Sequence, residues 1–141
     1  MAVNGRTAYF ADENAMGLAK LLIREHGRDD ILYPGHGKLP EIPRGTLDLD
    51  WMPVVGRNGW IVLTRDRRIR TRPAELIAYR EHGLRSVWIG GKRDHTSRDL
   101  AVMFVAHEER LTRMATKLGH GPWALAMSSS GVRELRLREP G

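Results

Sequence analysis

Short apolar runs alternate with amphipathic segments along this chain. Residues 7–11, 31–33, 60–64, 86–89 and 123–127 form runs of three to five residues, rich in β-branched, aromatic and leucine side chains, and predict buried strands. After the Ser-Ser-Ser-Gly turn at 128–131, residues 132–137 mix polar and apolar positions and predict an edge segment.

The segments between the strands carry helical periodicity. Apolar residues spaced three or four apart predict helices over about 16–26 and 97–118, with Asn14 as N-cap of the first and Thr96 or Ser97 as N-cap of the second. Pro73 is placed to open another helix. Residues 47–55 predict a short helix that begins with acids, and residues 34–45 are a Pro/Gly-rich loop that is either solvated or shapes a substrate groove.

Strands that alternate with helices predict one α/β domain over residues 1–141. Parallel neighbours need a crossover, which helices usually supply, so we expect a sandwich around a mostly parallel sheet of four to five strands. Ligands of such sheets bind beyond the carboxyl ends of the strands. The chemistry is therefore expected at that edge.

Composition narrows the classes of chemistry. The 141 residues contain no cysteine, which excludes disulfides, iron–sulfur clusters and thiolate zinc sites. The net charge of +6 favours a polyanionic partner, most simply a nucleic acid. No apolar run is long enough to cross a membrane and no secretory signal opens the chain, so we expect a cytoplasmic protein.

Three acids are candidates for that sheet edge. Asp12 directly follows the first apolar run, and Asp66 follows the run at 60–64 with one residue between. Asp48 opens the helix before that run, with Asp50 as an alternative. Clustered carboxylates are hard oxygen ligands suited to Mg²⁺ or Mn²⁺. The simpler explanation for each acid is a capping or turn role.

Several arginines lie near Asp66 in the sequence. If the two strands are neighbours, these arginines lie near the carboxylates, where they would hold phosphates beside a metal ion. They are Arg65, Arg67, Arg68, Arg70 and Arg72, of which the first three are the expected RNA phosphate contacts. The alternative is a solvated basic turn.

Three motifs stand out in the first two thirds of the chain: Tyr9-Phe10-Ala11-Asp12-Glu13-Asn14, Asp48-Leu49-Asp50-Trp51, and the segment 59–66 that ends in Thr-x-Asp. Together they resemble the PIN-like nuclease superfamily, and in particular compact bacterial members that include VapC-type toxins. Their order and spacing match over roughly residues 7–100.

The resemblance implies an α/β/α sandwich and an Mg²⁺- or Mn²⁺-dependent endoribonuclease, the toxin of a toxin–antitoxin pair. Asp12, Asp48 and Asp66 correspond to the catalytic, metal-binding acids, and Thr64 to the threonine beside them. Glu13, Asn14 and Asp50 would be secondary members. RNA and a cognate antitoxin are the implied partners, with the antitoxin inserting a basic side chain among the acids; a homodimer is compatible with this.

The chain departs from the PIN-like pattern at one acid, so a protein without catalytic activity stays an alternative. Many PIN nucleases carry a further glutamate on an early helix, and no equivalent is evident among Glu25, Asp29, Asp30 and Glu41. The alternative is a catalytically inactive PIN-like module that binds nucleic acid or regulates. A purely protein-binding domain is a third hypothesis.

Overall fold

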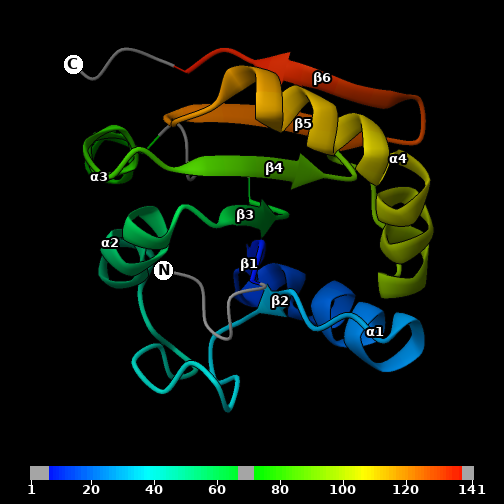
Figure 1. The fold of residues 1–141 in the computed structure, drawn as a ribbon, viewed down its shortest axis with the longest axis horizontal. Helices are drawn as coiled ribbons and strands as arrows, with labels where there is room; N and C mark the ends of the chain where they lie inside the picture. Colours follow the sequence, from blue (N-terminus) through cyan, green and yellow to red (C-terminus); the bar gives the residue numbers. More distant parts are fainter. Residues whose placement is uncertain (1–6, 67–71, 138–141) are drawn as a thin grey trace.

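A computed structural model describes residues 7–66 and 72–137 (Figure 1). In chain order the elements are β1 (Tyr9–Ala11), the 3-10 turn η2 (Glu13–Ala15), α1 (Met16–His26), β2 (Ile31–Leu32), α2 (Asp48–Asn58), β3 (Ile61–Thr64), α3 (Pro73–Glu81), β4 (Arg85–Ile89), α4 (Ser97–Leu118), β5 (Trp123–Ser128) and β6 (Gly131–Leu135).

These elements build an α/β fold with a mostly parallel sheet, as the alternating pattern predicts. The six strands lie in the order β2-β1-β3-β4-β5-β6, and all neighbours are parallel except β5 and β6. The expected number was four to five. The additional strand is β6, because the predicted edge segment pairs fully with β5 through a tight antiparallel turn.

Helices bury both faces of the sheet. In Figure 1, α1 and α4 lie to the right and α2 and α3 to the left. Successive residues of β1 point to opposite sides, so Tyr9 and Ala11 join the core under α1 and α4, while Phe10 joins the core under α2 and α3. A strand buried on both faces reads as a continuous apolar run, which explains the sequence pattern.

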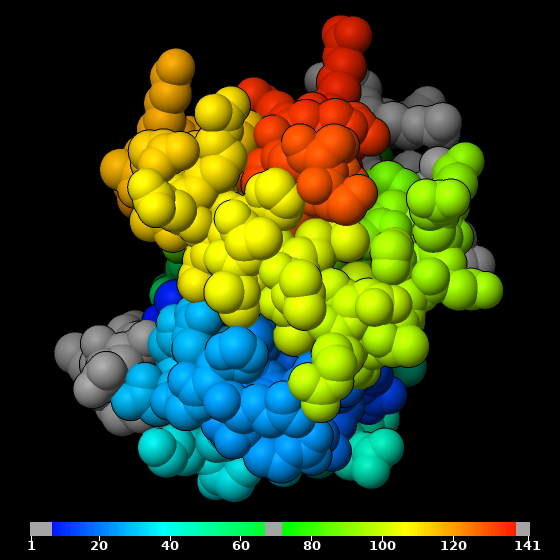
Figure 2. Space-filling model, turned by 90° about the vertical axis from the view of Figure 1, so that its right-hand side faces the viewer, coloured from blue at the N-terminus to red at the C-terminus, as the bar shows by residue number. Residues whose placement is uncertain are grey.

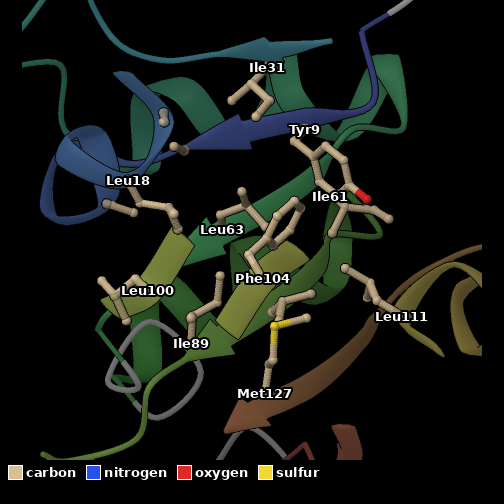
Figure 3. Close-up of a cluster of buried hydrophobic side chains, with 14 of the residues drawn as sticks. Tyr9, Leu18, Ile31, Ile61, Leu63, Ile89, Leu100, Phe104, Leu111 and Met127 are labelled. Carbon is tan, nitrogen blue, oxygen red and sulfur yellow. The ribbon is translucent and has the colours of Figure 1, made fainter. Parts of the chain in front are cut away.

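The larger core lies under α1 and α4. Figure 2 shows α1 in blue and α4 in yellow side by side on the surface, and Figure 3 shows the side chains packed beneath them. Leu18 and Phe104 are at most 1% exposed, and the ring of Phe104 packs edge-on against Tyr9 at 5.3 Å between centroids. His107 of α4 is half-buried, and its Nε2 lies 3.3 Å from the carbonyl oxygen of Ser129.

The N-cap predicted for α4 is confirmed and the one predicted for α1 is not. Thr96 caps α4 in a reciprocal capping box with Asp99, as expected. The prediction for α1 is wrong: its N-cap is Ala15, and Asn14 lies one residue earlier in the 3-10 turn. The helix ends at His26, as predicted, and Gly27 follows it in a left-handed conformation with φ of 63°.

Strand order brings the predicted acidic edge together. β1 lies beside β3 with Ala11 opposite Leu63, so the residues that follow these strands meet at the carboxyl edge. The backbone N–H of Asp12 donates to the carbonyl of Leu63 over 3.1 Å, which extends the pairing by one residue. Within 7–66 and 72–137, no helix combines the length and hydrophobicity that a membrane crossing requires.

Candidate active site

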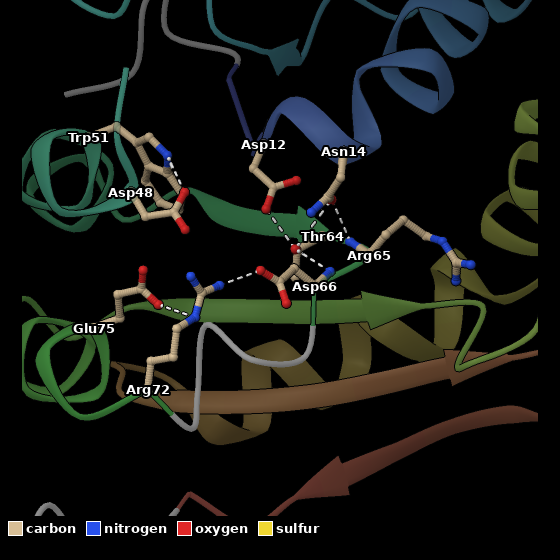
Figure 4. A network of polar contacts seen from close by, with 9 residues as sticks. All are labelled: Asp12, Asn14, Asp48, Trp51, Thr64, Arg65, Asp66, Arg72 and Glu75. Carbon is tan, nitrogen blue, oxygen red and sulfur yellow. Dashed lines mark hydrogen bonds and ion pairs between the residues drawn. The ribbon is translucent and has the colours of Figure 1, made fainter. Parts of the chain in front are cut away.

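Asp12 is the most buried acid at this edge, with 4% of its surface exposed. Its Oδ2 accepts a 2.6 Å hydrogen bond from the Thr64 hydroxyl (Figure 4). Its Oδ1 is buried and has no hydrogen-bond partner among the described residues. Burial raises the pKa of Asp12 to about 7, with smaller contributions from the charges of Asp48 and Asp66, while the bond from Thr64 opposes the rise.

The Thr64 side chain organises the end of β3. Its hydroxyl donates to Asp12 and accepts the backbone N–H of Asp66 over 2.9 Å. The Asn14 side-chain oxygen accepts the backbone N–H of Arg65 over 2.7 Å. The Asp-Glu-Asn turn is thereby tied to the Thr-x-Asp turn. This explains why Asn14 is not the helix cap: its acceptor is used across the sheet.

Asp48 reaches the same edge from the first turn of α2. Its Oδ1 accepts a 3.1 Å bond from the indole N–H of Trp51, and Trp51 is 1% exposed, so the core holds this carboxylate in place. Burial raises the pKa of Asp48, the bond from Trp51 and the charge of Arg72 lower it, and the charges of Asp66 and Glu13 raise it. Asp50 is exposed on the same helix.

Asp66 is turned toward a basic side chain. The Arg72 guanidinium contacts Asp66 Oδ2 at 2.5 Å, and its Nε contacts Glu75 Oε2 at 2.8 Å (Figure 4). Sequence reasoning did not include Glu75 as a site residue. Its place in the first turn of the helix that begins at Pro73 was the available signal, but an acid there is also typical of a helix start.

An open hollow lies at this edge beside Asp12 and Asp48, and Asp66 is not among the residues that line it. It is lined by Asp12, Glu13, Asn14, Gly45, Thr46, Leu47, Asp48, Leu49, Trp51, Arg72 and Glu75. The predicted loop after β2 forms part of its wall, because Leu39 and Ile42 anchor the loop in the core and the Gly45 N–H donates to Glu13 Oε1. Asp50 does not line the hollow.

The predicted arginines divide into two groups. Arg65 extends away from the acids in Figure 4, and its guanidinium donates to backbone carbonyls of Ile89, Gly91 and Arg93 in the β4–α4 connection. This geometry favours a role in holding that connection over the predicted phosphate contact. Arg67 and Arg68 lie outside the described residues.

The donor chemistry suits a hard divalent cation. Carboxylate oxygens are the preferred ligands of Mg²⁺ and Mn²⁺, and the buried unpartnered Oδ1 of Asp12 is the kind of atom that a cation satisfies. Within the described part of the chain, however, no three acidic or histidine side chains stand close enough to share one ion. Asp12 and Asp48 face the hollow, whereas Asp66 is engaged by Arg72.

Fold and site together define an α/β protein with an acidic site at the carboxyl edge of a parallel sheet. The family model described as PIN-like domain matches residues 8–91, more than half of the chain, and includes Asp12, Asp48, Asp66 and Glu75. The chain therefore belongs to the PIN-like domain family, whose members are generally nucleases that typically use divalent metals. Comparison with curated proteins and with solved structures found no match.

Proposed function

We propose that this protein is a metal-dependent endoribonuclease that hydrolyses RNA phosphodiester bonds. The observation that carries the proposal is the buried Asp12 carboxylate, with one oxygen fixed by Thr64 and the other unpartnered within the described structure, beside Asp48 in an open hollow. A buried carboxylate left without a full set of partners costs stability, which is typical of sites kept for function.

In this proposal Asp12, Asp48 and Asp66 hold Mg²⁺ or Mn²⁺. The ion supplies activation of a water nucleophile and neutralises charge on the phosphodiester. Thr64 fixes one oxygen of Asp12, Trp51 orients Asp48, and the Thr64 hydroxyl holds the backbone at Asp66. Asn14 and Glu13 secure the turns around them.

RNA is the proposed substrate because the chain carries a net charge of +6, which attracts a polyanion. A cation held by the acids would bring the phosphodiester to them. Arg67 and Arg68 remain proposed phosphate contacts. The finer proposal is the toxin of a toxin–antitoxin pair, with an antitoxin whose basic side chain covers the acids.

The test is cleavage of a mixed structured RNA by the purified protein with Mn²⁺ and with EDTA. We expect metal-dependent cutting that Asp12→Asn and Asp66→Asn each abolish while thermal melts show a folded protein. Asp48→Asn and Asp50→Asn form a matched pair on one helix: the first removes an acid of the hollow and the second an exposed one.

Cutting that survives in Asp12→Asn, or that Asp50→Asn reduces as much as Asp48→Asn does, contradicts this assignment. Calorimetry gives the independent readout, since wild type is expected to bind Mn²⁺ saturably and Asp12→Asn to lose that binding.

A second candidate is an inactive module that binds nucleic acid. It draws support from the pairing of Asp66 with Arg72, which neutralises one of the three acids. This candidate predicts RNA binding that weakens steeply with salt and is indifferent to Mn²⁺. The same calorimetry separates the two candidates.

A further inference from the structure

Arg72 is the basic side chain closest to the proposed catalytic acids in the described part of the site. It lies between Asp66 and Glu75 in Figure 4, with separate nitrogens directed to each: one terminal nitrogen is 2.5 Å from Asp66 Oδ2, and Nε is 2.8 Å from Glu75 Oε2. It lines the same hollow as Asp12 and Asp48. Its positive charge also lowers the pKa of Asp48.

The chemistry of this contact bears directly on cation binding. A guanidinium keeps its proton throughout the accessible pH range, so its charge at the site is permanent. A divalent cation that binds Asp66 must displace this charge or share the carboxylate with it, and like charges at such separations repel. Asp12, a second acid that lines the hollow, independently favours a cation, because its Oδ1 atom is buried and unpartnered among the described residues.

Glu75 gives Arg72 a second partner. Because the two carboxylates contact different nitrogens, Arg72 can leave Asp66 and keep Glu75. Arg72 precedes α3 and Glu75 lies in its first turn, three residues further on, so the pair is local and survives a movement of Asp66. The Arg72 side chain is 43% exposed, which leaves room for such a rotation.

We propose that Arg72 is an internal competitor of the divalent cation: it pairs with Asp66 when the metal is absent and withdraws to Glu75 when the metal binds. Arg72 thereby sets the metal affinity of the site, and Glu75 acts through Arg72. This inference rests on the proposed function, because it concerns the metal site that the nuclease requires.

The experiment measures Mn²⁺ binding by calorimetry on the EDTA-treated, dialysed full-length protein. Arg72→Gln removes the competitor, and we expect its dissociation constant for Mn²⁺ to fall about tenfold, since one nearby charge is worth roughly a factor of ten. Arg113→Gln is the matched control. It removes the same charge from an exposed pair on α4 and is expected to change the constant less than about twofold.

Glu75 is tested by a double-mutant cycle. In the wild-type background Glu75→Gln leaves the Arg72 charge concentrated on Asp66 and is expected to weaken Mn²⁺ binding. In the Arg72→Gln background the same change is expected to have no effect. An effect of equal size in both backgrounds would show that Glu75 acts on the metal directly and would overturn its assigned role.

The outcomes separate this inference from the proposed function. Unchanged or weaker Mn²⁺ binding by a folded Arg72→Gln protein overturns the competition, even if wild type cuts RNA. Tighter binding without RNA cleavage supports the competition and counts against the nuclease. If neither wild type nor Arg72→Gln binds Mn²⁺, both fail.

Discussion

The charged side chains near the two ends of β1 differ in how completely they are paired. At the start of the strand the Tyr9 hydroxyl donates to Glu108 over 2.8 Å, and Arg28 contacts Asp30 and Glu108 through bonds of 2.7–2.9 Å. The Arg28 guanidinium also lies 5.6 Å from the Phe104 ring centroid. Every charge in this cluster has an opposite charge in contact with it, and the cluster ties the end of α1 to α4.

At the other end of β1, Asp12 is more buried than the Arg28, Asp30 and Glu108 side chains, with 4% of its surface exposed, and it has fewer partners. Thr64 is its one side-chain donor in the described structure, and Asp48 and Asp66 add negative charge around it. Only two residues of the strand, Phe10 and Ala11, separate Tyr9 from Asp12. The contrast shows that packing does not force the poor pairing at Asp12, since the same strand supports a complete ion network three residues earlier.

The largest stability effect is expected from Arg28→Met at the paired end. The change leaves Asp30 and Glu108 without their cation in a region where Arg28 is 20% and Glu108 26% exposed. We expect a loss of about 2–4 kcal/mol in the free energy of unfolding, measured by urea denaturation at pH 7.

Arg28→Met with Glu108→Gln is the control for that result. If the cost comes from an unpaired carboxylate, the double variant should be more stable than Arg28→Met alone. A double variant as unstable as the sum of the two single ones would mean that the side chains act through packing and not as a charge pair.

At the acidic end, Asp12→Asn is expected to stabilise the protein in EDTA at pH 8. The pKa of Asp12 in the folded state is about 7 against an ordinary value of 3.8, so between these values the folded protein holds a proton that the unfolded chain releases. Wild-type stability should therefore fall as pH rises from about 4 to about 7. At pH 8, urea denaturation should give Asp12→Asn a free energy of unfolding higher than that of wild type by on the order of 1–3 kcal/mol.

The pH dependence is the decisive part of that prediction. The two proteins should converge as the pH falls to about 4 and below, where the carboxyl is protonated in the folded state and becomes protonated in the unfolded chain as well. Stability curves that run parallel from pH 4 to pH 8 would contradict the assignment of an elevated pKa to Asp12.

Thr64→Val sharpens the comparison further. The Thr64 hydroxyl lowers the pKa of Asp12, so its removal is expected to raise that pKa above about 7 and to extend the fall in stability, which still begins near pH 4, to higher pH. We expect a loss of about 1 kcal/mol at pH 8, as for one buried hydrogen bond. Thr64→Ser keeps the hydroxyl and should retain the wild-type pH profile; a Ser variant that behaves like Val would point to the methyl group instead.

The position of the acidic edge could be predicted from the sequence because it depends on strand order. The apolar runs at residues 7–11 and 60–64 indicated buried parallel strands, and acids that follow such strands directly or after one residue reach the same edge. The pairing of Ala11 with Leu63 then places Asp12 beside Thr64. No side-chain geometry was needed for this step.

The partners of individual side chains could not be predicted in the same way. Asn14 had a good local role as a helix cap, but a backbone N–H fifty-one residues away, at Arg65, takes its oxygen. Arg65 and Arg72 both lie close to Asp66 in the sequence, and nothing there distinguishes their roles. In the structure Arg65 donates to a backbone carbonyl after β4, whereas Arg72 contacts Asp66 and Glu75. These choices depend on how helices and loops pack around the edge, which local patterns do not encode.

The smallest effect is expected from Arg113→Gln, which removes an ion pair with no burial. Arg113 and Glu109 are 2.8 Å apart on α4, but their side chains are 62% and 88% exposed. Water and salt screen such a pair, so urea denaturation at pH 7 should show a change within about 0.5 kcal/mol. The Arg28 and Glu108 side chains are 2.7 Å apart, which is almost the same distance. If Arg28→Met lowers the free energy of unfolding much more than Arg113→Gln does, burial and shared contacts account for the stability of the paired end. A loss from Arg113→Gln as large as that from Arg28→Met would remove the basis for distinguishing the two ends of β1, because distance alone would then account for both.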